Sequence, residues 1–395
     1  MMKKYLFFFF LPLLFFSCTL TEKEVTEDKI NGDEEISYYI SDGSGQKVYS
    51  FKKNDLIYAY PKTDTIFLKV NGKNYNFVLD QDKEQICVDN RVNFKFIKQK
   101  AFLCITYDDC PATDWNAYQK IHKQYDSVIP AELGLNINRR ALPIEQMKIM
   151  VEDGFEIVNH STSHHRLERV GLQKAVSKED NKIYGWFTHT FLDGAELFIG
   201  EETYKIVSHG SDSNGNYFVV DRPFLKNYGI GTSIQLSDEA LNNELFYGVE
   251  DIEKQLGTKI NHFTYPYTVS DKRTRKLIEE TNKYYSCRAY NGYYSDGKTK
   301  NLFDPGLNYF PFENKLTLNS ASFDLYYSEE EIKTIFEKAA KTKAMVIQFN
   351  HTWDSNFKIE KMKFLIDTAL DMGIEITTRT PIWDYYEINE MSNNN

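Results

Sequence analysis

The pattern of hydrophobic and polar positions changes near residue 100. From about 36 to 98, short segments of alternating polarity are separated by turn residues such as Asn71-Gly72, a pattern that predicts strands joined by tight turns. Beyond it, apolar segments alternate with segments of helical periodicity, which predicts an α/β fold with a largely parallel sheet. We therefore expect a small β domain at 36–98 followed by an α/β domain at 99–387.

Strands and helices are expected to alternate along the α/β domain, with one interruption. The predicted strands are Phe102–Tyr107, Glu156–Asn159, His262–Tyr265, Tyr285–Ala289, Met345–Asn350 and Ile374–Thr377. The predicted helices lie near 115–126, 143–153, 238–256, 271–283, 329–341 and 358–372. Gly154, Gly257 and Gly373 stand where helices commonly end. Residues 184–236 lack a helical period and carry turn signals, which predicts a β-rich insertion.

The first residues have the composition of an export signal. Two lysines are followed by the apolar run Tyr5–Ser17, which is too short to cross a bilayer core of about 30 Å as a helix. We therefore predict a signal peptide at 1–17 and an acidic, polar tether at 18–35. The small residue before Cys18 resembles the processing site of bacterial lipoproteins, which implies lipidation of Cys18. The protein would then be exported and anchored to the cell envelope, on its periplasmic or cell-surface side, with the lipid as its only membrane contact. An ordinary cleaved signal peptide is the alternative.

Charge and cysteine usage narrow the range of partners. The 47 lysines and arginines against 57 acidic residues give a net charge of −10, so the chain has no basic field to attract a nucleic acid. The 5 cysteines form no CxxC pair, and therefore indicate neither a zinc ribbon nor a disulfide framework. Cys104 lies in an apolar strand pattern and is expected to be buried.

Polar residues with catalytic potential follow three of the predicted strands. Asp108 and Asp109 follow the first, His160 and His164 the second, and His351 ends another. In a barrel, the carboxyl ends of parallel strands meet at one rim. Two imidazoles and one carboxylate there can bind a cation with coordination positions left open, and the second carboxylate is then free to act as a base. Taken singly, each segment also fits a structural role, as a capped turn, a chance histidine pair or a hydrogen-bonded histidine.

Together and in this order, these segments resemble the motifs of the polysaccharide deacetylase family, the NodB-homology type of carbohydrate esterase. Thr106–Pro111 is similar to its TFDDGP segment, and His160–His164 to its H-[ST]-x-x-H motif. Phe263–Tyr267 resembles FRxPYG, and His351 resembles the strand-ending histidine of the last motif. The resemblance covers about 100–385 without the insertion. It implies a distorted (β/α)7 barrel.

The resemblance also implies a role for each matched residue. Asp109, His160 and His164 would be the ligands of one divalent transition metal. This metal is most often zinc, with cobalt and nickel as alternatives. Asp108 would act as general base toward the attacking water, and the backbone N–H of Tyr267 would bind the oxyanion. His351 would protonate the leaving group. The implied substrate is an extracellular or cell-surface polysaccharide or oligosaccharide that carries N- or O-linked acetyl groups.

Several positions depart from the family pattern. Thr264 stands where the family has an arginine that pairs with the catalytic carboxylate, and loss of that charge would raise the pKa of Asp108. Arg288, near the end of a later strand, is a candidate replacement. Cys110 replaces the glycine after the two aspartates. Asn350 replaces a leucine, which predicts a more polar acetate pocket.

Two interpretations follow from the sequence. The retained acids and histidines favour a metal-dependent hydrolase, whereas Thr264 favours a catalytically impaired, glycan-binding surface lipoprotein. The acid expected to hold His351 is not identified by a motif, and Asp296 and Asp304 are the candidates. The insertion at 184–236 is expected to wall one side of the cleft and to select substrate.

Overall fold

The computed structural model describes residues 4–7, 36–41, 46–51, 56–62, 64–70, 73–88, 92–290 and 304–388. They fall into two compact units. The smaller holds the described residues of Met1–Lys100 and Ile382–Asn395, and the larger holds those of Ala101–Pro381. Most of the predicted leader, the lipidation candidate Cys18 and the tether lie outside the described residues. Within the described ranges, no helix combines the length and the apolar character needed to span a membrane.

Two four-stranded sheets form the smaller unit. One contains β1 (Lys4–Phe7), β4 (Leu56–Tyr60), β8 (Val92–Ile97) and β7 (Lys83–Val88). The other contains β3 (Gln46–Phe51), β2 (Ile36–Ser41), β5 (Thr65–Val70) and β6 (Lys73–Val78). As the alternating pattern predicts, β5 and β6 pair antiparallel, with Val70 opposite Lys73. The segment β1, which lies in the predicted leader, pairs in parallel with β4.

The described residues after Pro381 group with the smaller unit. Tyr386 packs its ring against that of Tyr60, with centroids 6.0 Å apart. Glu387 Oε2 forms an ion pair with Lys95 Nζ at 2.6 Å. The larger unit therefore ends at Pro381, whereas the sequence pattern placed the end of the α/β domain at 387.

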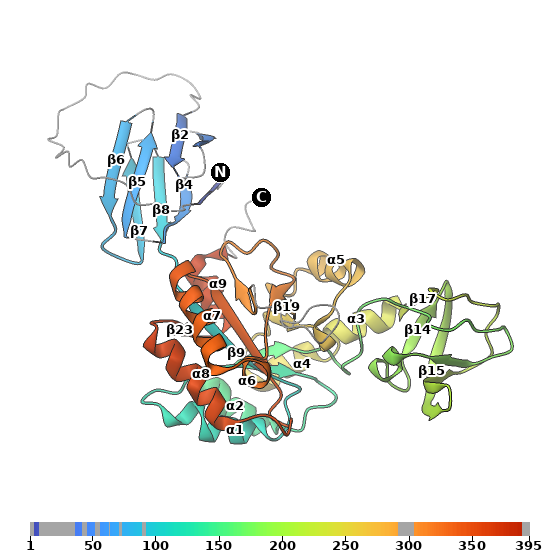
Figure 1. The fold of residues 1–395 in the computed structure, drawn as a ribbon. Coiled ribbons are helices and arrows are strands. Elements are labelled where there is room, and N and C mark those ends of the chain that lie inside the picture. The colour runs from blue at the N-terminus through green and yellow to red at the C-terminus, as the bar shows by residue number, and fades with distance from the viewer. Residues whose placement is uncertain are drawn as a thin grey trace. The chain divides into compact units, whose positions relative to one another are not determined.

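A barrel-shaped sheet surrounded by helices makes up most of the larger unit (Figure 1). The strand order is β20-β22-β9-β10-β11-β18-β19-β21, and β23 also pairs with β9. These strands are β9 (Phe102–Asp108), β10 (Glu132–Leu135), β11 (Glu156–Asn159), β18 (His262–Thr264), β19 (Ser286–Tyr290), β20 (Leu307–Asn308), β21 (Leu318–Asn319), β22 (Met345–Asn350) and β23 (Glu375–Ile376). A parallel bridge between Ala321 and Gln348 connects the region after β21 to β22, so the sheet is nearly closed. The predicted α/β barrel is confirmed.

Helices lie between the barrel strands, and all but the short α6 and the late α9 fall where the periodicity predicts. They are α1 (Asp114–Lys120), α2 (Ile144–Glu152), α3 (Asp238–Phe246), α4 (Val249–Leu256), α5 (Lys272–Thr281), α6 (Phe323–Tyr326), α7 (Glu329–Thr342), α8 (Ile359–Asp371) and α9 (Arg379–Tyr386). The single helix predicted over 238–256 is two helices, because Gly248 adopts a φ of 78° between them. Such a left-handed residue ends one helix and turns the chain into the next.

The strand β10 lies between β9 and β11 and was not predicted. Its segment contains a glutamate and a glycine, which weaken the apolar strand pattern. Glu132 is wholly buried because it pairs with Arg379 at 2.9 Å and accepts a hydrogen bond from Thr106 at 3.0 Å. A buried carboxylate needs such a partner, so a contact with a distant residue is what allows a glutamate within this buried strand.

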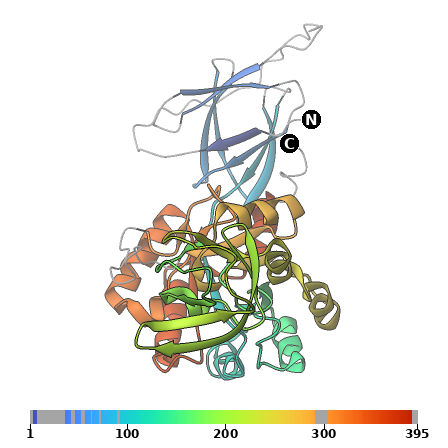
Figure 2. The same cartoon turned by 90° about the vertical axis from the view of Figure 1, so that its right-hand side faces the viewer.

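The β-rich insertion is a six-stranded sheet between β11 and α3, and it faces the viewer in Figure 2. It consists of β12 (Val170–Gly171), β17 (Ser233–Leu236), β14 (Glu196–Ile199), β15 (Glu202–Asp212), β16 (Gly215–Val220) and β13 (Lys182–Tyr184). The sheet therefore begins at Val170 rather than at 184. A short 3-10 helix, η2 (Trp186–Thr190), lies between β13 and β14. Phe187, Leu197 and Phe218 of the insertion are buried in the hydrophobic core of the larger unit.

Candidate active site

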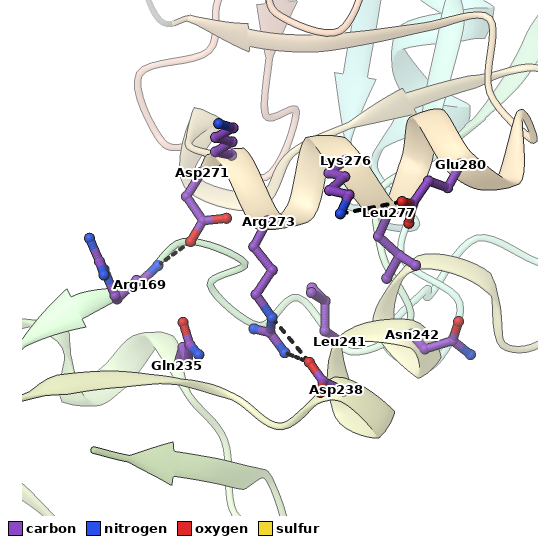
Figure 3. A pocket seen from close by; sticks show the side chains of 11 residues that line it. Arg169, Gln235, Asp238, Leu241, Asn242, Asp271, Arg273, Lys276, Leu277 and Glu280 are labelled. Atoms are coloured by element: carbon purple, nitrogen blue, oxygen red, sulfur yellow. Dashed lines mark hydrogen bonds and ion pairs between the residues drawn. The ribbon is translucent and has the colours of Figure 1, made fainter. Parts of the chain in front are cut away.

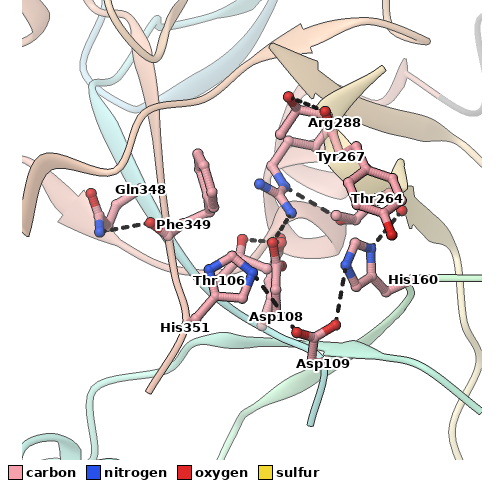
Figure 4. Close-up of polar contacts among 12 residues, drawn as sticks. Thr106, Asp108, Asp109, His160, Thr264, Tyr267, Arg288, Gln348, Phe349 and His351 are labelled. Atoms are coloured by element: carbon pink, nitrogen blue, oxygen red, sulfur yellow. Dashed lines mark hydrogen bonds and ion pairs between the residues drawn. The ribbon is translucent and has the colours of Figure 1, made fainter. Parts of the chain in front are cut away.

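The residues singled out in the sequence lie where barrel strands end (Figure 4). Asp108 is the last residue of β9, and Asp109 follows it. His160 follows β11, and His351 follows β22. Because β22, β9, β10, β11 and β18 are parallel, these ends share one rim of the barrel, where catalytic groups of such folds collect.

Asp109, His160 and His164 bring their donor atoms together, all within 4.8 Å of one another. The Oδ1 atom of Asp109 lies 3.7 Å from His160 Nε2 and 3.5 Å from His164 Nε2. His160 Nδ1 is 2.9 Å from the carbonyl of Thr264, and donation to this carbonyl leaves Nε2 free to coordinate a cation. Burial, together with the charge of His160, lowers the pKa of His164 to about 3, so its imidazole is neutral. This donor set fits a divalent transition metal.

The backbone around these side chains is strained. Asp109, Cys110, Ser161, His164 and Tyr267 have φ values of 76°, 47°, 68°, 64° and 57°, in a region that residues other than glycine rarely adopt. Surrounding hydrogen bonds hold this conformation, as between Ser161 Oγ and the His164 N–H at 2.9 Å. Cys110 therefore adopts a left-handed conformation that glycine would take without strain, and strain of this kind clusters at functional sites.

Asp108 forms a buried ion pair with Arg288. Arg288 Nη2 donates to Asp108 Oδ2 at 2.5 Å, and both side chains are almost fully buried. Burial alone would raise the pKa of Asp108, but Arg288, then His160 and His351, lower it below its usual value. The other oxygen, Oδ1, is buried without a hydrogen-bond partner among the described residues. Asp108 is thus an ionised carboxylate with one oxygen available to accept a proton.

The arginine comes from the strand next to the one expected. Thr264 on β18 and Arg288 on β19 are register partners, and Arg288 Nε lies 3.4 Å from Thr264 Oγ1. The guanidinium also packs over the ring of Phe349 at 4.6 Å. The candidate replacement named from the sequence therefore reaches the carboxylate that lacks the family's arginine (Figure 4).

His351 lies beside the same group of side chains, with Nε2 3.9 Å from Asp109 Oδ2. Of the two acids suggested to hold it, only Asp304 lies in the described part of the chain, and its recorded partners are other side chains. Asp304 pairs with Lys338 and accepts from Tyr309, and Asp296 lies outside the described residues. Asp324 in α6 is another acid near His351: burial raises its pKa to about 6, while hydrogen bonds from Gln348 and Ser322, and then the charge of His351, act to lower it.

Asn350, the last residue of β22, packs against a helix. Its side chain is buried, and Nδ2 lies 3.7 Å from Met362 Sδ of α8. Neighbouring residues of a strand point to opposite faces, so Asn350 faces α8 while Phe349 faces Arg288. The expected effect of Asn350 on an acetate pocket stays a prediction.

Tyr267 lies in η3 (Pro266–Thr268), directly after β18. Its ring contacts that of His164, with centroids 4.8 Å apart. The ring centroid of His189, in η2 of the insertion, lies 6.3 Å from that of Tyr267. The insertion therefore borders the candidate site on the side of Tyr267.

An open groove of the larger unit lies apart from these side chains. This open groove of about 810 Å³ is lined by residues of α3, α5 and β17 (Figure 3). Several of its charged side chains pair with one another, as Arg273 does with Asp238 and Lys276 with Glu280. None of the candidate catalytic or metal-binding residues lines it, so volume alone does not identify the site.

Comparison with known families agrees with the motifs. Residues 97–191 match the family model described as polysaccharide deacetylase. This segment contains Asp108, Asp109, His160 and His164. No curated protein matches the chain.

Several solved structures resemble the chain at low sequence identity. The Xyl-CE4 domain of a multidomain xylanase from the hindgut metagenome of Trinervitermes trinervoides is 12% identical, with a TM-score of 0.39, over 72% of this chain and 90% of that one. A family 4 carbohydrate esterase from Streptomyces lividans, in complex with acetate, is 11% identical, with a TM-score of 0.38, over 71% and 92%. A CE4 family pseudoenzyme from Bacillus anthracis is 11% identical, with a TM-score of 0.40, over 72% and 66%.

Proposed function

We propose that the barrel is a metal-dependent deacetylase that removes N- or O-linked acetyl groups from an extracellular or cell-surface polysaccharide. The family match over 97–191 supports a hydrolase of the polysaccharide deacetylase type. The observation that carries the proposal is the Asp108–Arg288 ion pair, which holds an ionised base beside the cluster of Asp109, His160 and His164.

The proposed metal ligands are Asp109, His160 and His164. Their two nitrogen donors and one oxygen donor suit zinc, with cobalt and nickel as alternatives. When bound, the ion supplies positive charge that polarises the acetyl carbonyl.

The chain's own residues account for the proton transfers. Asp108 accepts a proton from the attacking water as oxygen adds to the acetyl carbon, and Arg288 keeps the carboxylate ionised until then. The backbone N–H of Tyr267 is proposed to donate to the oxyanion. His351 gives a proton to the leaving nitrogen or oxygen as its bond to the acetyl carbon breaks. The products are acetate and a sugar with a free amine or hydroxyl group.

A glycan-binding lipoprotein without turnover remains the competing function. Its sequence argument was the absence of the family's arginine at Thr264. The Asp108–Arg288 ion pair supplies that charge from the neighbouring strand, and this favours the enzyme.

Acetate release from a panel of acetylated glycans, with added zinc, cobalt or nickel, tests the proposal. We expect the purified protein to bind about one ion per chain and to lose activity when a chelator removes it. Asp108→Asn should abolish acetate release while metal stays bound. Asp251→Asn, a change to an exposed carboxylate of α4, should behave like the parent. An Asp108→Asn variant with full turnover would exclude the proposed base, and glycan binding without acetate release by the metal-loaded parent would favour the competing function.

We further propose that the protein is exported and anchored to the cell envelope through a lipid on Cys18. The support is the leader-like composition of 1–17 and the small residue before Cys18. Labelling with a fatty acid in a bacterial host tests this. Cys18→Ala should lose the label and leave the membrane fraction, whereas retained label in that variant would refute lipidation at this position.

A further inference from the structure

Trp353 contacts the candidate metal-binding cluster but has no part in the roles described so far. It lies on the loop after β22, and its indole Nε1–H donates to Asp109 Oδ2 at 3.1 Å. Its ring centroid is 5.2 Å from that of His351, yet the side chain is 57% exposed. An exposed indole N–H can donate to water instead, so a hydrogen bond to a protein carboxylate adds little to the stability of the fold. The contact between Trp353 and a candidate metal ligand therefore points to a role at the site.

Buried hydrogen bonds fix the loop that carries this side chain. Thr352 Oγ1 donates to Asp114 Oδ1 at 2.6 Å and lies 2.7 Å from Thr113 Oγ1. Asp114 is fully buried at the start of α1. The scaffold therefore holds the residue between His351 and Trp353 in place, and with it the approach of the indole to Asp109.

The two carboxylate oxygens of Asp109 face different groups. Oδ1 faces the Nε2 atoms of His160 and His164, at 3.7 and 3.5 Å. Oδ2 is shared between the indole N–H of Trp353 at 3.1 Å and His351 Nε2 at 3.9 Å. A neutral donor that occupies Oδ2 satisfies this oxygen without a proton transfer. Removal of the indole would let His351 move onto Oδ2 and turn the carboxylate away from the imidazoles.

We propose that Trp353 is a positioning residue, whose indole N–H holds Asp109 in its metal-binding orientation and keeps His351 from pairing with that carboxylate. The inference rests on the proposed function, since it takes Asp109 as a metal ligand and His351 as a proton donor. Outer hydrogen bonds to a ligand of this kind commonly change metal affinity by about 10–100-fold.

Metal affinity measured by competition with a chelator tests the inference without any substrate. Trp353→Phe keeps an aromatic ring but removes the N–H, and we expect it to bind zinc and cobalt at least about 10-fold more weakly. The control is Trp186→Phe, because Trp186 is similarly exposed, at 54%, and packs on Phe187 and Arg166 rather than on a ligand. We expect this control to match the parent. The visible spectrum of the cobalt-loaded Trp353→Phe protein should also differ from that of the parent.

The outcomes separate this inference from the proposed function. Parent-like zinc affinity and an unchanged cobalt spectrum in Trp353→Phe would overturn the role of Trp353 and leave the deacetylase proposal standing. Weakened metal binding in a protein that releases no acetate would support the role of Trp353 and refute the deacetylase. A parent that takes up no transition metal would overturn both. Circular dichroism of each variant distinguishes a loss of affinity from a loss of fold.

Discussion

Exchange of Thr264 and Arg288 tests whether the ion pair with Asp108 is what the site requires, regardless of which strand supplies the arginine. In Arg288→Thr, Asp108 remains buried without its charge partner. Removal of one member of a buried pair typically costs about 3–5 kcal/mol. We therefore expect the free energy of unfolding to fall by about that amount at neutral pH, and acetate release to fall with it.

The double variant Thr264→Arg/Arg288→Thr returns the guanidinium from the adjacent strand. The two positions are register partners whose side chains already contact each other, and neighbouring strands lie only about 4.8 Å apart. An arginine side chain is long enough to span that difference. We expect the double variant to regain more than half of the lost stability and a measurable part of the activity.

Urea unfolding followed by tryptophan fluorescence is a suitable assay, because three of the four tryptophans, Trp115, Trp186 and Trp353, belong to the larger unit. The pH dependence gives a second readout. In the parent the pKa of Asp108 is lowered, so its contribution to stability is present above the unfolded pKa near 3.8 and is lost as pH falls through the folded pKa. The gap between parent and Arg288→Thr should therefore shrink toward acid pH.

Two results would refute this reasoning. A loss below about 1 kcal/mol in Arg288→Thr would show that the pair contributes no more than an exposed ion pair does. A double variant no better than the single one would show that the position of Arg288 matters beyond its charge.

Two further changes test other parts of the barrel. Gly134→Ala places a Cβ 2.8 Å from Asp108 Oδ1, and should lower kcat at least about 10-fold with a stability cost of about 1–3 kcal/mol. The control Gly229→Ala, whose Cβ meets no atom within 4 Å, should leave kcat and stability unchanged. Equal kinetics in the two variants would contradict this. Burial lowers the pKa of His122 from 6.5 to about 4, so its contribution to stability is complete above pH 6.5 and falls by about 3 kcal/mol as pH drops toward 4. His122→Gln should flatten the dependence of urea stability on pH over this range, and an unchanged slope would assign that dependence to other groups.

The sequence predicts the parts of this molecule that depend on local pattern. The strands β9, β11 and β22 are recognisable in the sequence as apolar runs, because almost all of their residues are buried in the sheet. Their ends carry Asp108, His160 and His351, so the parallel topology alone predicts that these side chains meet at one rim. The strain at Asp109 and Cys110 has no such signal, since nothing in the sequence marks a left-handed residue that is not glycine.

What the sequence does not predict depends on contacts between distant residues. The strand β10 contains Glu132, whose buried charge is compensated by Arg379, a residue far away along the chain. The contact between Trp353 and Asp109 joins residues separated by 244 positions. Each of these pairs becomes visible only when the barrel brings its strands together.

Arg288 shows why the absence of a motif residue is weak evidence against catalysis: a residue of another strand can take its place. A carboxylate buried at a barrel rim needs a compensating charge, and that requirement concerns a position in space rather than a position in the chain. Adjacent parallel strands present register partners to the same face, so an arginine on β19 can satisfy Asp108 as well as one on β18. The observation that should decide between an active and an impaired site is therefore whether a buried cation reaches Asp108, and not whether residue 264 is an arginine.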